Sequence, residues 1–567
     1  MMRPAEFSFR TRQKNLETLA RENFDLCVIG GGITGAGIAR DAALRGLSVA
    51  LVERCDFATG TSSRSSKLVH GGLRYLQMGD VGLVREAATE RYVLRKLAPY
   101  LARPAQMLVP VSSRSGYAKI RVGLWTYDRL AQVSDEERHR MLGKEEALDL
   151  EPSLRPETLY GAGLYYEYLT DDARLVTEVI KSAAALGAVI ANHAEVTAGL
   201  IENNRLRGVV VRDRENDAEL TVRARVVINA AGPWVDAVRL MGEPGESPRL
   251  RLTKGIHISV PFERLPLTRI VVMNARDHRG VFAIPRGAVT YLGTTDTDYG
   301  PPEENPSITL DDVEYLLDAA ARTFAVEPLA PSDVVTAWAG LRPLLHQEGK
   351  KPSELSRKDE IMYGGTGMIS IAGGKLTTFR RMAERVVDIA CERLKEQGRT
   401  LPPRAGESAA VPLSGGETGD DVAGYAGRLS QRWPRLGADI VDRLVQHYGS
   451  NAERMVEAMS ADPVLAERYA PGSAVTRGEI EYSVREEMVL TLEDVLERRS
   501  RLLLWDPANG LPVAEGVART LASLLKWNGT RANDELARYR AHVRQIKSFQ
   551  QADVINSEAV EAAHASA

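Results

Sequence analysis

A glycine-rich turn near the start of the chain restricts its possible folds more than any other feature. An apolar run at residues 24–29 is followed by the turn at 30–35, GGGITG, and then by a helical pattern at 33–45. A second apolar run at 48–53 ends in an acid, Glu53. Strand, glycine turn, helix and strand, with an acid closing the second strand, predict a βαβ unit that binds a dinucleotide.

Each part of this turn has its own physical role. Gly30 permits the tight turn, Gly32 lets the backbone approach a pyrophosphate, and Gly35 lets the helix pack closely on the strand. The first helical residues, Ile33 and Thr34, bring free N–H groups and a partial positive charge to the phosphates. The acid would accept hydrogen bonds from the adenosine ribose. We therefore predict that the turn and the acid contact a dinucleotide.

Three later segments favour FAD over NAD as this dinucleotide. Residues 61–75 are dense in hydroxyl groups, small side chains and cations, which suits either the wrapping of an anionic cofactor or a solvated loop. The strand at 226–234 ends in small residues, and glycines at 373–378 precede a helix whose N-terminus would face a negative group such as a reduced flavin. The residues predicted to contact the cofactor here, together with Val196, are Thr61, Ser62, Ser66, Lys67, His70, Gly71, Gly72, Ala231, Gly232, Gly374, Lys375, Leu376 and Thr377.

Composition excludes several other classes of protein. Hydrophobic residues make up 44% of the 567 residues, and 73 Lys and Arg against 76 Asp and Glu give a net charge of −3, so nucleic acid is not expected as a partner. Three cysteines, Cys27, Cys55 and Cys391, match neither a disulfide framework nor a zinc site, and no metal is predicted. No run reaches the ~18 apolar residues of a membrane span, and residues 1–24 lack a secretory signal. We expect a cytoplasmic protein, peripheral on the cytoplasmic face of the membrane.

The hydrophobic pattern predicts the other elements of the chain. Residues 1–23 suggest a short surface helix or a frayed end, and residues 80–180 are expected to be mostly helical. Strands are expected at 207–211, 225–228, 288–291 and 368–371, and helices at 310–323, 376–395 and 486–504.

Eight motifs together resemble one family of flavoproteins. They are GGGITGAGIARDAALRG (30–46), TSSRSSKLVHGGLRYL (61–76), DDARLV (171–176), NAAGPW (229–234), KGIHI (254–258), GTTD (293–296), GLRPL (340–344) and GGKLTT (373–378). With them, the chain from about residue 24 to 530 resembles the FAD-dependent glycerol-3-phosphate dehydrogenases, within the D-amino-acid-oxidase-like flavoproteins. KGIHI and GLRPL, together with HGGLRY, are the most specific motifs.

The resemblance implies an α/β fold with three parts: a Rossmann-like FAD-binding domain, a mainly antiparallel β-sheet substrate domain and a C-terminal all-α domain, which we interpret as a structural or dimer-forming cap. The expected ranges are 24–100, 170–240 and 350–396 for FAD binding, 101–169 and 241–349 for substrate, 397–417 for a Pro- and Gly-rich linker, 418–548 for the helical domain and 549–567 for a disordered tail.

The resemblance also implies an activity. This is the oxidation of sn-glycerol 3-phosphate to dihydroxyacetone phosphate, with non-covalent FAD as hydride acceptor and membrane quinone as the final acceptor. A related oxidase branch uses dioxygen, but no long insertion between 300 and 400 of the kind found in that branch is present. A homodimer and contact with an anionic membrane surface are expected, through the basic residues of 1–21 or the C-terminal helices. A flavin amine oxidase and a catalytically silent FAD-binding scaffold are the alternatives.

Four cations match family positions that bind the substrate. A phosphomonoester carries close to two negative charges at pH 7, and arginine donates two hydrogen bonds at once to such a group. The residues are Arg74, Arg342, Arg357 and Lys375. Arg342 is the strongest candidate from the residues alone, because it places a charge inside an apolar run.

Hydride loss from carbon 2 also requires a base for the hydroxyl proton, and the family match indicates His257. Taken alone, a histidine between apolar strand neighbours is more often a core residue. His70 is expected nearer the flavin, and Tyr75 and Thr377 could add neutral hydrogen bonds to the substrate. The residues leave open which group takes the proton. The resemblance assigns catalysis to His257, Arg342 and Lys375.

Overall fold

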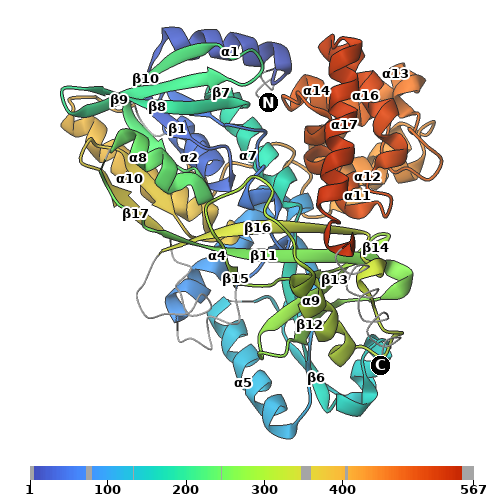
Figure 1. Ribbon diagram of the computed structural model, residues 1–567. Helices are drawn as coiled ribbons and strands as arrows, with labels where there is room; N and C mark the ends of the chain where they lie inside the picture. The colour runs from blue at the N-terminus through green and yellow to red at the C-terminus, as the bar shows by residue number, and fades with distance from the viewer. Residues whose placement is uncertain are drawn as a thin grey trace, which may run out of the picture.

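The computed structural model describes residues 6–71, 80–131, 133–243, 245–345, 359–402 and 406–551. Two sheets and a group of C-terminal helices make up this structure, as Figure 1 shows. The α/β class with a helical C-terminal part is therefore confirmed.

The first sheet contains the predicted dinucleotide-binding unit. Its strands are β1 (Asn23–Ile29), β2 (Val49–Val52), β7 (Val189–Ala191), β8 (Ala194–Glu202), β9 (Arg205–Asp213), β10 (Glu219–Asn229), β17 (Glu360–Tyr363) and β18 (Ile369–Ala372). Five parallel strands lie in the order β7-β2-β1-β10-β18, and β17 and β9 add antiparallel to β18 and β10. β1 and β2 are parallel neighbours, as a βαβ unit requires.

Helices bury both faces of this sheet. On one side lie α2 (Ile33–Leu44), α7 (Asp172–Ala185) and α10 (Phe379–Glu396), and on the other α1 (Phe9–Arg21), α8 (Val235–Gly242) and the β8–β9 hairpin. Leu26 and Val28 of β1 face the first group, whereas Cys27 and Ile29 face the second. A strand buried on both faces has no polar side, which explains the unbroken apolar run from Leu26 to Ile29 in β1.

The second sheet is mainly antiparallel. Its strands are β3 (Leu68–Val69), β4 (Arg103–Val111), β5 (Arg140–Gly143), β6 (Gly161–Leu169), β11 (Leu250–Pro261), β12 (Ile270–Asn274), β13 (Gly280–Arg286), β14 (Val289–Gly293), β15 (Thr297–Asp298) and β16 (Thr336–Leu345). The order is β15-β11-β14-β13-β12-β4-β6-β3, with β16 beside β11 and β5 beside β6. Helices α4 (Val81–Leu97), α5 (Arg114–Ala131), α6 (Lys144–Leu150) and α9 (Leu310–Thr323) belong to the same part of the chain.

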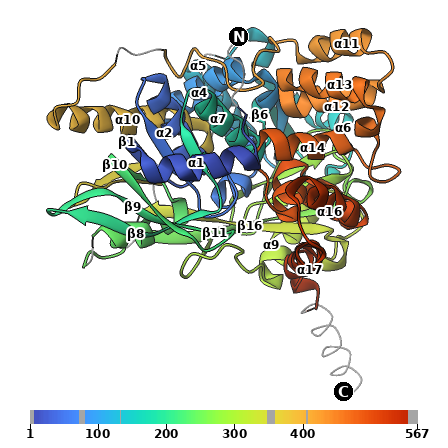
Figure 2. The same cartoon turned by 90° about the horizontal axis from the view of Figure 1, so that it is seen from above.

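The C-terminal helices lie together along one side of the molecule (Figure 2). They are α11 (Val422–Arg432), α12 (Ala438–Tyr448), α13 (Ala452–Ala461), α14 (Arg477–Glu486), α15 (Leu502–Trp505), α16 (Leu511–Leu525) and α17 (Gly529–Gln545). One hydrophobic cluster joins residues of α14, α16 and α17 to Tyr291 and Trp338 of the second sheet. The C-terminal part is thus continuous with the core behind that sheet. Among the helices of the described ranges, none is both long and apolar enough to span a bilayer.

Three predictions about secondary structure need correction. Residues 80–180 contain α4, α5, α6 and the start of α7, as predicted, but the prediction missed the strands β4 and β6, which pair with each other from Arg103–Leu169 to Val111–Gly161. The predicted helix at 486–504 is interrupted, because residues 487–491 are not helical. The Asp494 carboxylate accepts the N–H groups of Leu490 and Thr491 there. Phe549, expected in a disordered tail, is 2% exposed.

The predicted helix within residues 1–23 is present as α1. Ser8 caps it by accepting the N–H of Thr11. Leu16 and Leu19 pack in the core of the first sheet, and Arg12 forms a buried ion pair with Asp213 at 2.5 Å. α1 therefore covers the sheet with its apolar side.

Candidate active site

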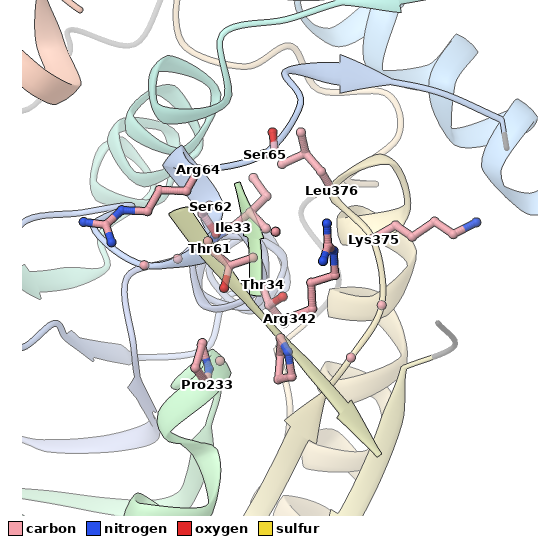
Figure 3. Close-up of a pocket in the computed structure, with 18 of the residues that line it drawn as sticks. Ile33, Thr34, Thr61, Ser62, Arg64, Ser65, Pro233, Arg342, Lys375 and Leu376 are labelled. Atoms are coloured by element: carbon pink, nitrogen blue, oxygen red, sulfur yellow. The ribbon is translucent and has the colours of Figure 1, made fainter. Parts of the chain in front are cut away.

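A cavity of about 720 Å³ lies where the two sheets meet, outside the carboxyl ends of β1, β2, β10 and β18. In α/β proteins this edge of a parallel sheet is where ligands bind. One end of the cavity is lined by the glycine turn and the other by β11 and β16 of the second sheet. Residues from both ends are drawn in Figure 3.

Backbone geometry at the glycine turn excludes side chains. Gly30 has φ of +108°, and a Cβ added there would lie 2.6 Å from the carbonyl oxygen of Ala230. A Cβ on Gly35 would lie 1.9 Å from the carbonyl oxygen of Gly30. Gly32 is the N-cap of α2 and lines the cavity together with Ile33 and Thr34. The first turn of α2 thus directs its N–H groups toward the cavity, although Ser62 Oγ accepts the N–H of Ile33 at 3.0 Å.

Glu53 is held at the end of β2 by two backbone donors. The N–H of Gly31 donates to Oε2 at 2.6 Å, and the N–H of Cys55 donates to Oε1 at 2.8 Å. Burial raises the pKa of Glu53, and these two hydrogen bonds oppose that effect. Each carboxylate oxygen keeps a second lone pair for a ligand hydroxyl. The position suits contact with a ribose.

Most of the residues predicted to contact cofactor or substrate line this one cavity. They are Gly30, Gly32, Ile33, Thr34, Glu53, Thr61, Ser62, Ser66, His70, Val196, Ala231, Gly232, His257, Arg342, Gly374, Lys375, Leu376 and Thr377. Gly72, Arg74, Tyr75 and Arg357 lie outside the described residues. Gly35, Lys67 and Gly71 are described but do not line it.

The side chain of Lys67, a predicted cofactor contact, forms an internal ion pair away from the cavity. Its side chain is 1% exposed, and Nζ lies 3.1 Å from Asp172 Oδ2 and donates to the Ser63 carbonyl at 2.8 Å. Burial lowers the pKa of Lys67 to about 8, although Asp172 acts in the opposite direction. Gly71 has a similar structural role, because its N–H donates to Glu167 at 3.1 Å. Both residues fix the segment that carries Ser66 and His70.

His257 lies on β11 at the second-sheet end of the cavity. It is 2% exposed, its Nε2 is 2.8 Å from Ser66 Oγ, and its ring stacks on Trp338 with centroids 4.9 Å apart. Burial lowers the pKa of His257 well below 6.5, and the charges of Lys67 and Arg342 add to that effect. The imidazole is therefore neutral at pH 7 and available as a base.

Arg342 on β16 has an acidic neighbour that the sequence did not predict. Its Nη1 donates to Asp296 at 3.0 Å, and Nη2 donates to Thr294 Oγ1 at 3.0 Å and to the Thr295 carbonyl at 3.1 Å. Arg279 reaches the same Asp296 at 3.9 Å. All three charged residues line the cavity, so two guanidinium groups face it around one carboxylate.

Comparison with known proteins decides the family. Residues 25–380 match the family described as FAD dependent oxidoreductase, and residues 407–532 match the C-terminal domain of alpha-glycerophosphate oxidase. An aerobic glycerol-3-phosphate dehydrogenase of Staphylococcus haemolyticus is 40% identical over 92% of this chain and 94% of its own length. The chain belongs to the FAD-dependent glycerol-3-phosphate dehydrogenase family.

Solved structures support this membership of the dehydrogenase family. The glycerol-3-phosphate dehydrogenase of Bacillus halodurans, solved in complex with FAD, has a TM-score of 0.80 and 36% identity, and the match covers 95% of this chain and 98% of that one. An L-alpha-glycerophosphate oxidase of Mycoplasma pneumoniae, with FAD bound, has a TM-score of 0.55 at 19% identity, which shows a shared fold.

FAD is the cofactor of this dehydrogenase-family chain, and the described residues fit it. Gly30 and Gly35 of the glycine turn have no room for side chains, α2 presents its N-terminus, and Glu53 is held at the sheet edge. These features suit the pyrophosphate and the ribose. Gly373 and Gly374, with φ of +78° and +81°, let the chain turn beside the cavity before α10.

Two residues that line the cavity, Glu167 and Tyr165, were not predicted from the sequence. Glu167 and Tyr165 on β6 line the cavity, and Glu167 binds Arg91 at 2.6 Å and Tyr127 at 2.9 Å. Sequence periodicity placed these residues in a helical region, so their alternation along a strand was missed.

Lys375 lines the cavity, but its side chain points away from the other labelled residues in Figure 3.

Proposed function

We propose that the protein oxidises sn-glycerol 3-phosphate at carbon 2 to dihydroxyacetone phosphate, with FAD as hydride acceptor and membrane quinone as the final acceptor. Relatives at 40% identity are named aerobic glycerol-3-phosphate dehydrogenase. The observation that carries the proposal is that one cavity is lined by His257, by the cluster of Arg342, Asp296 and Arg279, and by the dinucleotide turn.

The donor groups of this cluster suit a phosphomonoester. Arg342 and Arg279 bring two guanidinium groups to the cavity, and each can donate two hydrogen bonds to a phosphate of about −1.5 to −2 charge. Asp296 and Asp277 offset the formal charge of the two arginines, so the donor groups rather than the net charge support this assignment. Asp296 also holds Arg342 in a fixed orientation, so less side-chain entropy is lost when the planar guanidinium binds oxygen atoms. We therefore place the phosphate of the substrate at Arg342 and Arg279.

His257 is proposed as the acceptor of the C2 hydroxyl proton. FAD, when bound, supplies the hydride acceptor. The neutral imidazole has one unprotonated nitrogen that can take a proton, and Ser66 Oγ, 2.8 Å from Nε2, orients the ring. The stack on Trp338 limits its rotation further. These contacts position the base before substrate binds, which lowers the entropic cost of reaction.

An exposed helix offers the surface for contact with the membrane. α5 exposes Val122 by 61% and Trp125 by 55%, whereas α1, the earlier candidate, uses Leu16 and Leu19 in the core. The exposed residues of α5 include four cations, Arg114, Lys119, Arg121 and Arg129. Exposed Trp beside Lys and Arg is typical of helices that lie in an anionic interface. We propose α5 as the docking surface that brings the enzyme to quinone.

Substrate specificity separates this proposal from a flavin amine oxidase and from a silent scaffold. We expect turnover with sn-glycerol 3-phosphate, formation of dihydroxyacetone phosphate, and no turnover with glycine or sarcosine. Turnover of the amino acids alone would establish the amine oxidase, and a flavin that no substrate reduces would establish the scaffold.

The acceptor is tested on membranes. With vesicles of phosphatidylglycerol and phosphatidylcholine that contain a quinone, we expect co-sedimentation at low salt and quinone reduction faster than peroxide release. Trp125→Ala should weaken binding, whereas Tyr363→Ala, which removes an exposed aromatic residue on β17, should not. Peroxide as the main product would reassign the enzyme to the oxidases. Equal binding of both variants and wild type would exclude α5.

A further inference from the structure

We propose that the C-terminal helices position His257, and that Arg501 and Trp505 are the residues through which they act. Both lie at the short helix α15, where Arg501 is the N-cap and Trp505 the last residue. Neither side chain lines the cavity. The inference rests on the proposed role of His257 as the proton acceptor, and it gives the C-terminal part a function beyond that of a structural cap.

The first connection is ionic. Arg501 is 1% exposed, and it forms ion pairs with Asp172 and, at 3.2 Å, with Asp171. These two acids begin α7, on the first sheet's side of the molecule. Asp172 Oδ2 accepts the N–H of Ser65 at 3.1 Å and its hydroxyl at 2.7 Å, and it pairs with Lys67 at 3.1 Å. Arg501 therefore fixes the Asp172 carboxylate, which in turn binds both neighbours of Ser66.

Ser66 connects this ionic arrangement to His257 through a hydrogen bond. Its Oγ lies 2.8 Å from Nε2 of His257, and its carbonyl accepts the Tyr291 hydroxyl at 3.0 Å. Because Ser65 and Lys67 are fixed on either side, the Ser66 side chain has little freedom to leave the imidazole. A shift of the Asp172 carboxylate would move all three residues together. Such a shift would change the position of the Ser66 hydroxyl relative to Nε2.

The second connection is aromatic. The His257 ring stacks on Trp338 at 4.9 Å with an interplanar angle of 9°, and Trp338 meets Trp505 edge to face at 6.0 Å. Trp505 also packs on Tyr291 at 5.4 Å. The Lys67 ammonium lies 5.0 Å from the Trp338 ring and 5.9 Å from the Trp505 ring, so it joins the ionic and the aromatic connection.

Backbone conformation marks Arg501 as a constrained position. It has φ of +62°, a left-handed conformation that a residue with a Cβ rarely adopts. It follows the π-helical residues Asp494–Arg499, another uncommon element that is often found at functional sites. Such a backbone persists where its surroundings determine it, and here the side chain is fixed by two carboxylates. We infer that the backbone of this segment places Arg501 and Trp505 against the residues that contact His257.

The test compares variants of the FAD-loaded full chain. Arg501→Met should lower kcat about 10- to 100-fold, with KM for glycerol 3-phosphate changed less than about 3-fold and FAD content unchanged, because misplacing a reacting group costs rate rather than binding. Arg501→Lys, which keeps the charge, should recover part of kcat. Trp505→Ala should lower kcat in the same way, and Trp505→Phe should restore most of it.

Arg531→Met is the control, because Arg531 pairs with Glu215, in the turn between β9 and β10 of the first sheet, and with Glu535. It should leave kcat within about 2-fold of wild type. Hydrogen–deuterium exchange of peptides covering residues 63–70 should rise in Arg501→Met and not in Arg531→Met. Unchanged kcat and exchange in Arg501→Met would overturn the proposal, as would an equal loss in the control.

Two further results are interpreted separately: a variant that does not fold, and a wild type without activity. If Arg501→Met does not fold, the Trp505 pair decides alone, and wild-type kcat in Trp505→Ala would overturn the proposal. If the wild type itself does not oxidise glycerol 3-phosphate, the proposed function fails; the exchange of residues 63–70 then decides whether Arg501 holds this segment.

Discussion

The two ends of the cavity are built in different ways. At the cofactor end, glycines, helix N–H groups and one acid come from a single stretch between residues 30 and 53. At the substrate end, His257, Asp296 and Arg342 come from strands or loops separated by tens of residues and joined by the pairing of β11 with β14 and β16. The first end depends on backbone shape, and the second on side chains held in register.

This difference predicts which kinds of substitution each end tolerates. The cofactor end tolerates change in side-chain chemistry but not in backbone space, because a Cβ on Gly35 would meet a carbonyl oxygen. The substrate end tolerates small packing changes, but it depends on particular charges. Changes at the first end should therefore remove flavin and stability together, whereas changes at the second should remove activity and leave flavin in place.

The largest effect is expected at Gly35. Gly35→Val puts atoms where the backbone of Gly30 already lies, and overpacking of this kind costs about 3 kcal/mol or more of unfolding free energy. We expect loss of bound flavin, measured as the ratio of visible to ultraviolet absorbance, and a lower melting temperature. Retention of flavin at wild-type stoichiometry would contradict the backbone account of this end.

Arg342→Ala should have the next largest effect, at the other end. It removes the guanidinium that we propose binds the substrate phosphate, together with its 3.0 Å hydrogen bond to Asp296. We expect kcat/KM to fall about 10³-fold, equivalent to about 4 kcal/mol, with FAD still bound. Arg342→Lys should fall between this variant and wild type, since it keeps the charge but not the planar fork. Steady-state kinetics with near-wild-type kcat would refute the role of Arg342.

A smaller effect is expected at Arg279. Its guanidinium reaches Asp296 at 3.9 Å and is also held by Asp277 at 2.6 Å. If it adds a second charge to the phosphate site, Arg279→Met should raise KM about 10-fold and change kcat little, which corresponds to about 1.4 kcal/mol of uniform binding. A fall in kcat with unchanged KM would place Arg279 outside the phosphate site.

The smallest effect concerns stability against pH. The pKa of His257 is lowered in the folded chain, so the unfolded chain binds more protons and stability falls as the pH drops below about 6.5, by at most ~1.4 kcal/mol per pH unit. His257→Gln should flatten this dependence between pH 6.5 and 5.5 in flavin-free protein. Glu53→Gln should not flatten it, because the pKa of Glu53 is raised in the folded chain and its contribution to the pH dependence of stability has the opposite sign. Equal slopes in wild type and His257→Gln would contradict the lowered pKa.

The sequence predicted the cofactor end well because its signals are local. A glycine spacing, an apolar run on each side and one acid are all visible within about 25 residues, and β1, α2 and β2 begin and end within one residue or so of the predicted ranges. The dinucleotide fingerprint therefore needs no knowledge of which distant strands pair.

The substrate end was predicted only where a family motif named the residue. Asp296 belongs to the GTTD motif but was given no role, and Arg279 was not singled out, since a charged residue has no local signature for a partner contributed by another strand. Glu167 was missed because β4 and β6 pair across the intervening α5, β5 and α6, and long-range pairing outweighs local propensity. The predicted helix at 486–504 failed similarly: its apolar spacing is helical, but the Asp494 carboxylate binds the N–H groups of Leu490 and Thr491.

The most direct test of the account is the anaerobic reduction of the bound flavin. Glycerol 3-phosphate is added to the FAD-loaded protein without acceptor, and the flavin absorbance in the visible range is followed for wild type and Arg342→Ala. We predict rapid bleaching of the wild type and slow or no bleaching of the variant, with both proteins retaining FAD. A wild-type flavin that stays oxidised, although FAD is released on denaturation, would contradict the assigned substrate while leaving the fold intact.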